Sequence, residues 1–303
     1  MTDGSITGVG TEMRSYYGRP ILKEPVWQPE IPFYFFTGGI AGGCSVLHGL
    51  ARIAGHERLA KTALYVGAAA DVVSPILLIS DLGRPERFLN MLRVFKVTSP
   101  MSVGSWVLFV SGGASTTAAV LERLGILKRV KVAAEAASFL AGPPLATYTG
   151  TLIADTAIPV WHEARHELPW LFGASASASA GAATALVLPP REAGPARRLA
   201  IGGAAAVLGL KEVMQRRLGF VGEVYEKEEA GRYGKLAKGL TAAGAGLLAL
   251  GGKRSRAAAV AGSALVLGGE LALRWSVFKA GFQSARDPRY TVIPQRERLA
   301  AKS

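Results

Sequence analysis

The sequence predicts an all-α integral membrane protein, a bundle of about eight transmembrane helices with almost no soluble domain. Three observations favour this fold class. Half of the residues are hydrophobic and 19% are charged, whereas a soluble domain carries roughly 25% charged residues. The apolar residues come in blocks of about 20, the length that a helix needs to cross a hydrocarbon core. Lys and Arg gather at the ends of these blocks.

Each apolar block predicts one transmembrane helix. Residues 38, 39, 42 and 43 of the first block are glycines, and small residues four apart on one face indicate that another helix packs closely there. The segment GASASASAGAA in the fifth block offers a similar surface. The expected spans are residues 31–54, 59–80, 101–121, 132–154, 168–189, 198–215, 236–252 and 256–278.

The rest of the chain consists of two tails and two long polar connections. A polar N-terminal tail, residues 1–30, and a polar C-terminal tail, residues 286–303, flank a transmembrane domain of residues 31–285. The tail at the start has no basic segment followed by a short apolar one, so we expect no cleavable signal peptide. Residues 81–100 and about 216–235 form the long connections, and connections of that size are often functional. Short basic loops favour both termini facing outward.

The composition argues against several classes of function. The net charge is +13, but Lys and Arg form no patch interleaved with aromatic residues, so we expect anionic lipid rather than nucleic acid as their partner. Cys44, the only cysteine, excludes an intramolecular disulfide and a cysteine-held cluster. Of the four histidines only His48 lies inside a span, so we expect no haem. His162 and His166 lack a nearby third ligand, so we expect no metal site.

Ionisable residues inside the spans are candidates for function, because an unpaired charge in hydrocarbon is costly. Asp71 lies near the middle of the second span. It is either hydrogen-bonded to a neighbouring helix or exchanges protons with a redox ligand. Glu270 and Arg274 are four residues apart, which allows an intrahelical ion pair, and Lys211 and Glu212 end the sixth span in a similar way. Self-neutralising pairs and a proton path are both open.

The connection DLGRPERFLNMLRVFKVTSPMS carries an apolar stripe beside arginines. Asp81 is suited to cap a short helix that begins around Pro85. We expect this amphipathic helix to lie on the membrane surface between the second and third spans. It is either a lid on the bundle or a surface on which Asp81, Arg84 and Arg87 meet an electron-transfer partner.

Tyr148 lies about two turns before the end of the fourth span. A phenol at that depth can hydrogen-bond the carbonyl of a quinone, and Thr149 and Gly150 leave room beside it. Tyrosines near the interface also serve as anchors. Both interpretations are open.

Four segments together resemble the NrfD/PsrC family, the membrane subunits of polysulfide and nitrite reductase-type complexes. The resemblance runs from about residue 31 to residue 290, and its most specific part is the pairing of DLGRP with SPMS. The segments are YFFTGGIAGG, DLGRPERFLNMLRVFKVTSPMSVGSW, TYTGTLIADTAIPVWHEARHELPWLF and RWSVFKAGFQSARDP.

The resemblance implies an eight-helix bundle, which we expect to consist of two four-helix bundles. It implies that the chain binds menaquinol or ubiquinol as a substrate, with no haem, iron–sulfur cluster or metal of its own. Electrons would pass to a ferredoxin-like four-cluster iron–sulfur subunit and through it to a catalytic subunit, most often a molybdopterin enzyme. The location implied is the plasma membrane of a prokaryote, with several passes.

The resemblance also assigns roles to residues. Tyr148, in the YTG segment, is expected to hold the quinone ring, and Asp71, Glu212 and Arg274 are the candidates for proton handling. No residue of this chain matches the histidine that some family members use near the start of the first helix. There Tyr34 or Gln28 substitutes, or the site differs.

Two other functions compete with quinone chemistry. One is a membrane anchor without redox activity that holds a peripheral enzyme through the arginine-rich connection. The other is a proton-conducting bundle, which Asp71 and the eighth span suggest, although the chain lacks the paired interrupted helices of many transporters.

Overall fold

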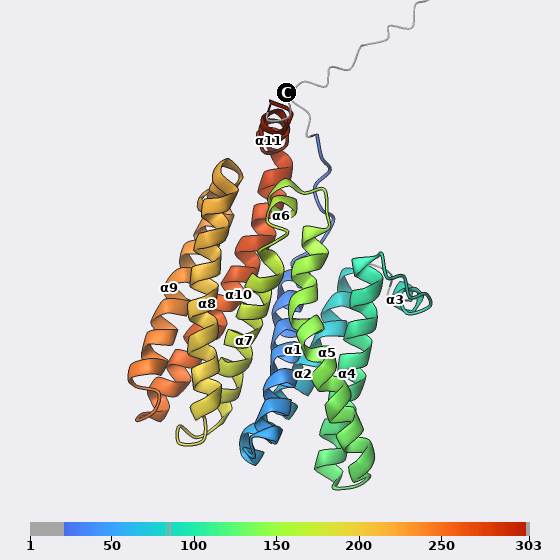
Figure 1. Ribbon diagram of the computed structural model, residues 1–303, viewed down its shortest axis with the longest axis vertical. Coiled ribbons are helices and arrows are strands. Elements are labelled where there is room, and N and C mark those ends of the chain that lie inside the picture. Colours follow the sequence, from blue (N-terminus) through green and yellow to red (C-terminus); the bar gives the residue numbers. More distant parts are fainter. Residues whose placement is uncertain (1–20, 83, 85, 301–303) are drawn as a thin grey trace, which may run out of the picture.

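The computed structural model describes residues 21–82, 84 and 86–300, and all secondary structure in this part of the chain is helical. Its body consists of helices of 20 residues or more that lie side by side (Figure 1). Each of the eight expected spans coincides with one of them. They are α1 (Glu30–Ile53), α2 (Glu57–Asp81), α4 (Pro100–Leu124), α5 (Lys128–Ala154), α7 (Leu168–Val187), α8 (Gly194–Leu218), α9 (Glu228–Leu250) and α10 (Arg256–Arg286).

Shorter helices occupy the connections and the C-terminal end. They are α3 (Arg87–Met91), α6 (Pro159–Glu163), the 3-10 helix η1 (Gly219–Glu226) and α11 (Arg289–Ala300). The prediction of a long polar connection near residues 216–235 is wrong. Its residues continue α8, form η1 and begin α9. Val221, Val224 and Tyr225 of η1 are buried, so apolar contacts hold this segment against the bundle.

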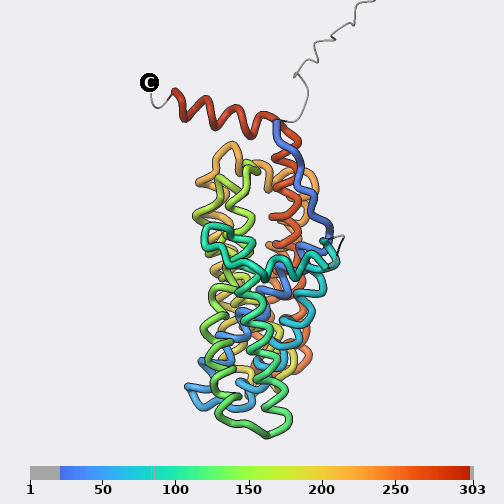
Figure 2. The backbone as a smooth tube through the Cα atoms, turned by 90° about the vertical axis from the view of Figure 1, so that its right-hand side faces the viewer, coloured from blue at the N-terminus to red at the C-terminus, as the bar shows by residue number. Residues whose placement is uncertain are grey.

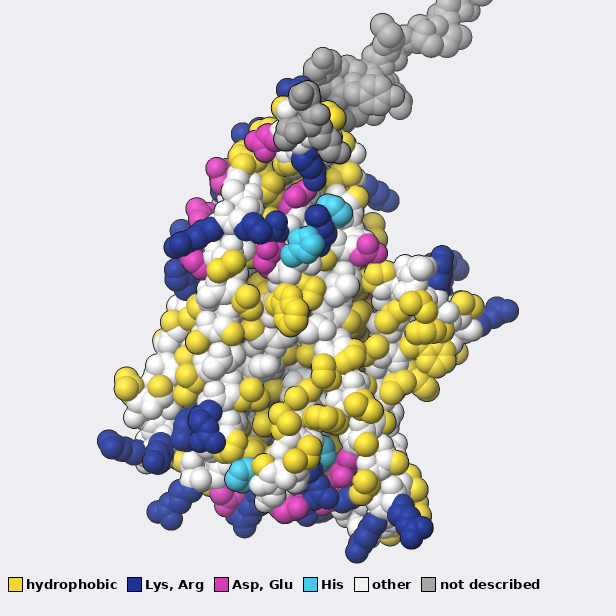
Figure 3. Space-filling model, viewed as in Figure 1, with side chains coloured by type: hydrophobic (Ala, Val, Ile, Leu, Met, Phe, Trp, Pro, Cys, Tyr) yellow, Lys and Arg dark blue, Asp and Glu magenta, His cyan; other side chains and the backbone are white. Residues whose placement is uncertain are grey.

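Four of the long helices, α2, α4, α7 and α10, have the length and hydropathy of membrane spans. The other long helices of the described chain fall outside the same limits, so the number of eight spans stays a prediction. Figure 3 shows the charge distribution that a membrane would require. Charged side chains gather towards the two ends of the visible face, and hydrophobic and uncharged atoms dominate between them.

The long helices fall into two groups, α1, α2, α4 and α5 on one side of Figure 1 and α7 to α10 on the other. Helix α1 packs against α2, α5 and α7, and α7 packs against α8 and α10, so α1 and α7 join the groups. The segment before α1 and helix α11 lie at the same end of the bundle, which Figure 2 shows with α11 running across that end.

The glycines of α1 allow this close packing, as predicted. A Cβ atom on Gly42 would lie 2.6 Å from the backbone nitrogen of Ala146 on α5, and one on Gly43 would lie 2.6 Å from the backbone oxygen of Ala176 on α7. Ala176 belongs to the small-residue segment of the fifth block. Two faces of α1 therefore lie directly against the backbones of α5 and α7.

Replacing Gly42 by alanine is expected to destabilise the protein by about 1–3 kcal/mol, because the added methyl has no space between two backbones. Thermal unfolding of the purified protein in detergent measures the change. Gly202→Ala on α8 is the matched control, since nothing lies within 4 Å of an added Cβ there. The control should be neutral or slightly stabilising. Equal melting temperatures for the two variants would contradict the packing argument.

Candidate functional site

A cavity of 260 Å³ lies at one end of the first helix group, near the point where the chain enters α1. Its walls come from the segment before α1 and from α1, α2, α4 and α5, and most of its exposed surface is apolar. Its lining includes Trp27, Tyr34, Asp81, Ser105 and Tyr148.

Two tyrosines from different helices meet in the wall of this cavity. The hydroxyl groups of Tyr34 on α1 and Tyr148 on α5 are hydrogen-bonded to each other. Tyr34 is 1% exposed, and Tyr148 is partly buried. The sequence proposed each residue separately, and the fold brings them together. The pair places two phenol groups, each able to donate and to accept a hydrogen bond, beside an apolar space.

Gly104 on α4 packs directly against the ring of Tyr148, and a Cβ atom on Gly104 would overlap that ring. A second cavity, of 470 Å³, lies between α4 and α5 and is also lined by Tyr148. The ring therefore separates two spaces, and Gly104 fixes its position from the α4 side. Sequence reasoning missed Gly104, because nothing in the order of residues indicates which ring faces it.

The segment before α1 covers one side of the first cavity and is held at three points. The backbone N–H of Gln28 donates to Asp81 at 2.8 Å, and the ring of Trp27 stacks on Trp161 with 5.5 Å between centroids. Glu24 accepts hydrogen bonds from Arg286 at 2.9 and 3.0 Å, which lowers the pKa of the Glu24 carboxyl. Gln28 itself is exposed, so it meets the site through its backbone.

The connection after α2 contributes to the same region. Helix α3 is short, Arg87–Met91, and the expected start of a helix around Pro85 lies outside the described residues. Arg84 and Arg87 are exposed, whereas Asp81 faces the cavity. In Figure 3 the region of α3 projects from the side of the bundle and carries hydrophobic atoms with basic side chains at its edge. The apolar side chains include Leu89, Val94 and Phe95.

Asp71 lies in the middle of the first helix group and is 1% exposed. Its carboxylate accepts hydrogen bonds from Ser115 at 2.5 Å and from Ser111 at 3.3 Å, both on α4. One turn further along α2, Ser74 donates to Thr37 on α1 at 2.8 Å. Asp71 is thus hydrogen-bonded to a neighbouring helix, which was one of the two interpretations of the sequence. These bonds satisfy a buried carboxylate that would otherwise be costly.

Glu270 and Arg274 of α10 are both buried but do not form the ion pair that their spacing allows. The guanidinium of Arg274 lies 3.7 Å from the ring centroid of Phe172 on α7 and donates to the Phe172 carbonyl at 3.2 Å. Glu270 accepts from Thr241 on α9 at 3.2 Å. Each residue extends towards a different neighbouring helix, so helix packing overrides the local spacing.

Lys211 and Glu212 also point apart. Glu212 pairs with Arg216 at 2.9 Å on the surface, and Lys211 lies between α8 and α9, where its ammonium group donates to the Gly234 carbonyl at 3.3 Å. The fold therefore brings none of Asp71, Glu212 and Arg274 into the cavity of the two tyrosines.

Within the described residues, no group of three or more His, Cys, Asp or Glu residues is arranged to hold a metal ion. His48 is buried, with Nδ1 2.8 Å from the Ala60 carbonyl and Nε2 3.5 Å from Glu135. The side chain of Glu135 is only 12% exposed and also lies 3.8 Å from the ammonium group of Lys131. His162 and His166 are both exposed.

Comparison with known proteins supports a membrane protein, and it supports the part of the resemblance that falls within residues 21–194. No curated protein matches the sequence. The family model described as polysulphide reductase, NrfD, matches residues 21–194, which include the whole first helix group, both tyrosines and α7. The segment RWSVFKAGFQSARDP lies beyond the matched residues. Because the match covers more than half of the chain, the protein belongs to the NrfD family, the membrane subunits of reductase complexes.

Proposed function

We propose that this chain is a quinone-reactive subunit and that the cavity beside Tyr34 and Tyr148 holds the quinone ring. The observation that carries the proposal is the pair of phenol groups at the wall of an apolar cavity of 260 Å³. A quinone ring is flat and apolar, with a carbonyl at each of two opposite positions. Pockets for such ligands are mostly apolar and have a few placed polar groups.

The polar groups of the cavity suit both redox states of the ligand. Tyr148 donates a hydrogen bond to a quinone carbonyl or accepts one from a quinol hydroxyl, and Tyr34 holds the Tyr148 hydroxyl in place. Oxidation of a quinol releases two protons and two electrons. Asp81 is the carboxylate in the cavity wall and is the group placed to accept the first proton, which it passes to solvent before it accepts the second.

The electrons need an acceptor outside the chain. We propose a ferredoxin-like four-cluster iron–sulfur subunit, connected to a catalytic molybdopterin subunit, that docks beside the exposed Arg84 and Arg87. The quinone is menaquinone or ubiquinone. The site lies close to this connection, because Asp81 at the end of α2 is part of the cavity wall.

The eight long helices are proposed to cross the plasma membrane of a prokaryote, so that the start of α1 and the end of α10 lie on one side. Within the bundle, Asp71 and Arg274 are proposed to handle protons, because both are buried ionisable groups at helix contacts. Glu212 was a third candidate, but its exposed pair with Arg216 adds no support for that role.

Tyr148→Phe is expected to weaken binding of a quinone analogue by about tenfold, because one hydrogen bond to a buried carbonyl is lost. Fluorescence or calorimetric titration of the purified subunit measures the affinity. Tyr233→Phe is the matched control, since the ring of Tyr233 stacks on Trp275 in the other helix group. Unchanged affinity in the Tyr148 variant would remove this residue from the site.

The same experiment separates the proposal from the anchor function. The exposed apolar and basic surface around α3 would serve an anchor equally well. An anchor without redox activity binds no quinone analogue in the cavity and shows no quinone-dependent reduction of its partner's clusters. That result, together with intact assembly of the complex, would favour the anchor.

A further inference from the structure

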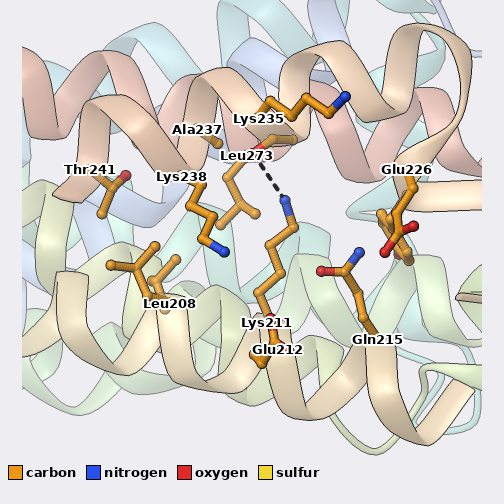
Figure 4. A pocket seen from close by; sticks show the side chains of 13 residues that line it. Leu208, Lys211, Glu212, Gln215, Glu226, Lys235, Ala237, Lys238, Thr241 and Leu273 are labelled. Carbon is orange, nitrogen blue, oxygen red and sulfur yellow. Dashed lines mark hydrogen bonds between the residues drawn. The ribbon is translucent and has the colours of Figure 1, made fainter. Parts of the chain in front are cut away.

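A second polar feature lies far from the tyrosine cavity, in the other helix group. A cavity of 330 Å³ opens between α8 and α9, and Lys211, Lys235 and Lys238 are part of its lining (Figure 4). In Figure 4, Lys211 rises from α8 towards α9, and Lys238 points from α9 into the space between them. The amide of Gln215 lies beside Lys211 in this view, while the ammonium group of Lys235 is directed away from the cavity.

The two converging lysines have few partners. Lys211 is 9% exposed, and among the residues that the structure describes the one hydrogen-bond acceptor of its ammonium group is the Gly234 carbonyl at 3.3 Å. A Cβ atom on Gly234 would lie 2.9 Å from that ammonium group, so the glycine leaves the room that Lys211 needs. Lys238 forms no ion pair with any described residue. A buried ammonium group with a single neutral acceptor is costly without a counter-charge.

The acidic residues near the cavity do not balance the lysines. Glu212 is engaged by Arg216 at 2.9 Å. Glu226 also lines the cavity, at its other end in Figure 4. Glu270 accepts a hydrogen bond from Thr241 at 3.2 Å and attracts the ammonium group of Lys211 without forming an ion pair with it. The lining therefore holds three lysines against two glutamates, one of which is engaged by Arg216.

The two lysines lie where the uncharged stretch of each helix meets its charged part, which is the level of lipid headgroups if α8 and α9 cross the membrane as proposed. Lys238 is the last charged residue of α9 before the uncharged segment 239–250, and Lys211 is the first charged residue of α8 after the uncharged segment 199–210. Basic pockets between helices at this level suit anionic lipid headgroups.

We propose that this cavity is a binding site for a phosphate group, with Lys211 and Lys238 as its cationic ligands. The chemistry is that of an anion with several oxygen acceptors, to which ammonium groups donate charge-assisted hydrogen bonds. Such a group belongs either to the headgroup of an anionic phospholipid or to a free phosphate. The site is independent of the tyrosine cavity, so quinone binding does not enter its test.

The test uses the full-length protein in neutral detergent and follows its melting temperature. Phosphatidylglycerol is titrated against phosphatidylcholine with the same acyl chains, and inorganic phosphate against chloride at equal ionic strength. A ligand that binds the folded protein raises the melting temperature with concentration. For Lys238→Gln we expect an affinity about tenfold weaker than for the unchanged protein.

Lys253→Gln is the matched control, because Lys253 is exposed in the turn between α9 and α10, at the other end of α9. Lys211→Met tests the buried lysine of the site. If that variant fails to fold, Lys238→Gln still tests the site, because Lys238 is exposed. Stabilisation by phosphatidylglycerol alone assigns a lipid headgroup, and stabilisation by inorganic phosphate as well assigns a free anion. No anion-dependent shift, or equal losses in Lys238→Gln and Lys253→Gln, would overturn the proposal.

Discussion

Replacing Gly104 by valine is expected to weaken quinone-analogue binding by about 10- to 100-fold. The new side chain would occupy the volume of the Tyr148 ring, so the ring must leave its position between the two cavities or α4 must move away. If the ring leaves, its hydrogen bond with Tyr34 breaks, and if α4 moves away, the part of the cavity wall that α4 contributes is displaced. Titration of the purified subunit with a quinone analogue measures the loss, and thermal unfolding reports the accompanying cost of overpacking, about 1–3 kcal/mol.

The control for this variant lies on the same helix. Gly113 of α4 is exposed, and nothing lies within 4 Å of an added Cβ there, so Gly113→Val carries the same change in helix propensity without the collision. Its affinity for the analogue should stay within about twofold of the unchanged protein. If both valine variants bound the analogue normally, the ligand would not depend on the position of Tyr148.

Replacing Asp71 by asparagine is expected to slow quinone-dependent turnover of the assembled complex by at least about tenfold, since a buried group that exchanges protons cannot be replaced by an amide. Asparagine has nearly the same size and still accepts hydrogen bonds from Ser111 and Ser115. The fold and quinone-analogue affinity should therefore remain. Turnover and binding are measured on the same preparation.

A purely structural Asp71 gives a different result. In that case Asp71→Asn keeps full turnover, and removal of the hydrogen bonds by Ser115→Ala lowers the melting temperature without a separate effect on rate. The comparison distinguishes proton exchange from a satisfied buried carboxylate, the two interpretations that the sequence left open.

Local patterns predicted the helices, because the length and composition of an apolar block depend only on the residues within that block. Blocks of about 20 apolar residues gave the positions of the long helices. The glycines of α1 gave the close contacts with α5 and α7, since a missing side chain permits close approach whichever helix the partner is. Tyr148 was identified through a motif of adjacent residues. The connection at residues 216–235 was misjudged because its polar composition hid three apolar residues that pack against the bundle.

By itself, the sequence determined the helical class, the places of the long helices and the identity of most candidate residues. Only the tertiary structure decided which of them meet. It joined Tyr34 to Tyr148 across 114 positions, turned Asp81 into the cavity and drew Arg274 to Phe172 rather than to Glu270. The physical reason is that helix rotation and pairing depend on contacts summed along whole helices, and no spacing within one segment records them.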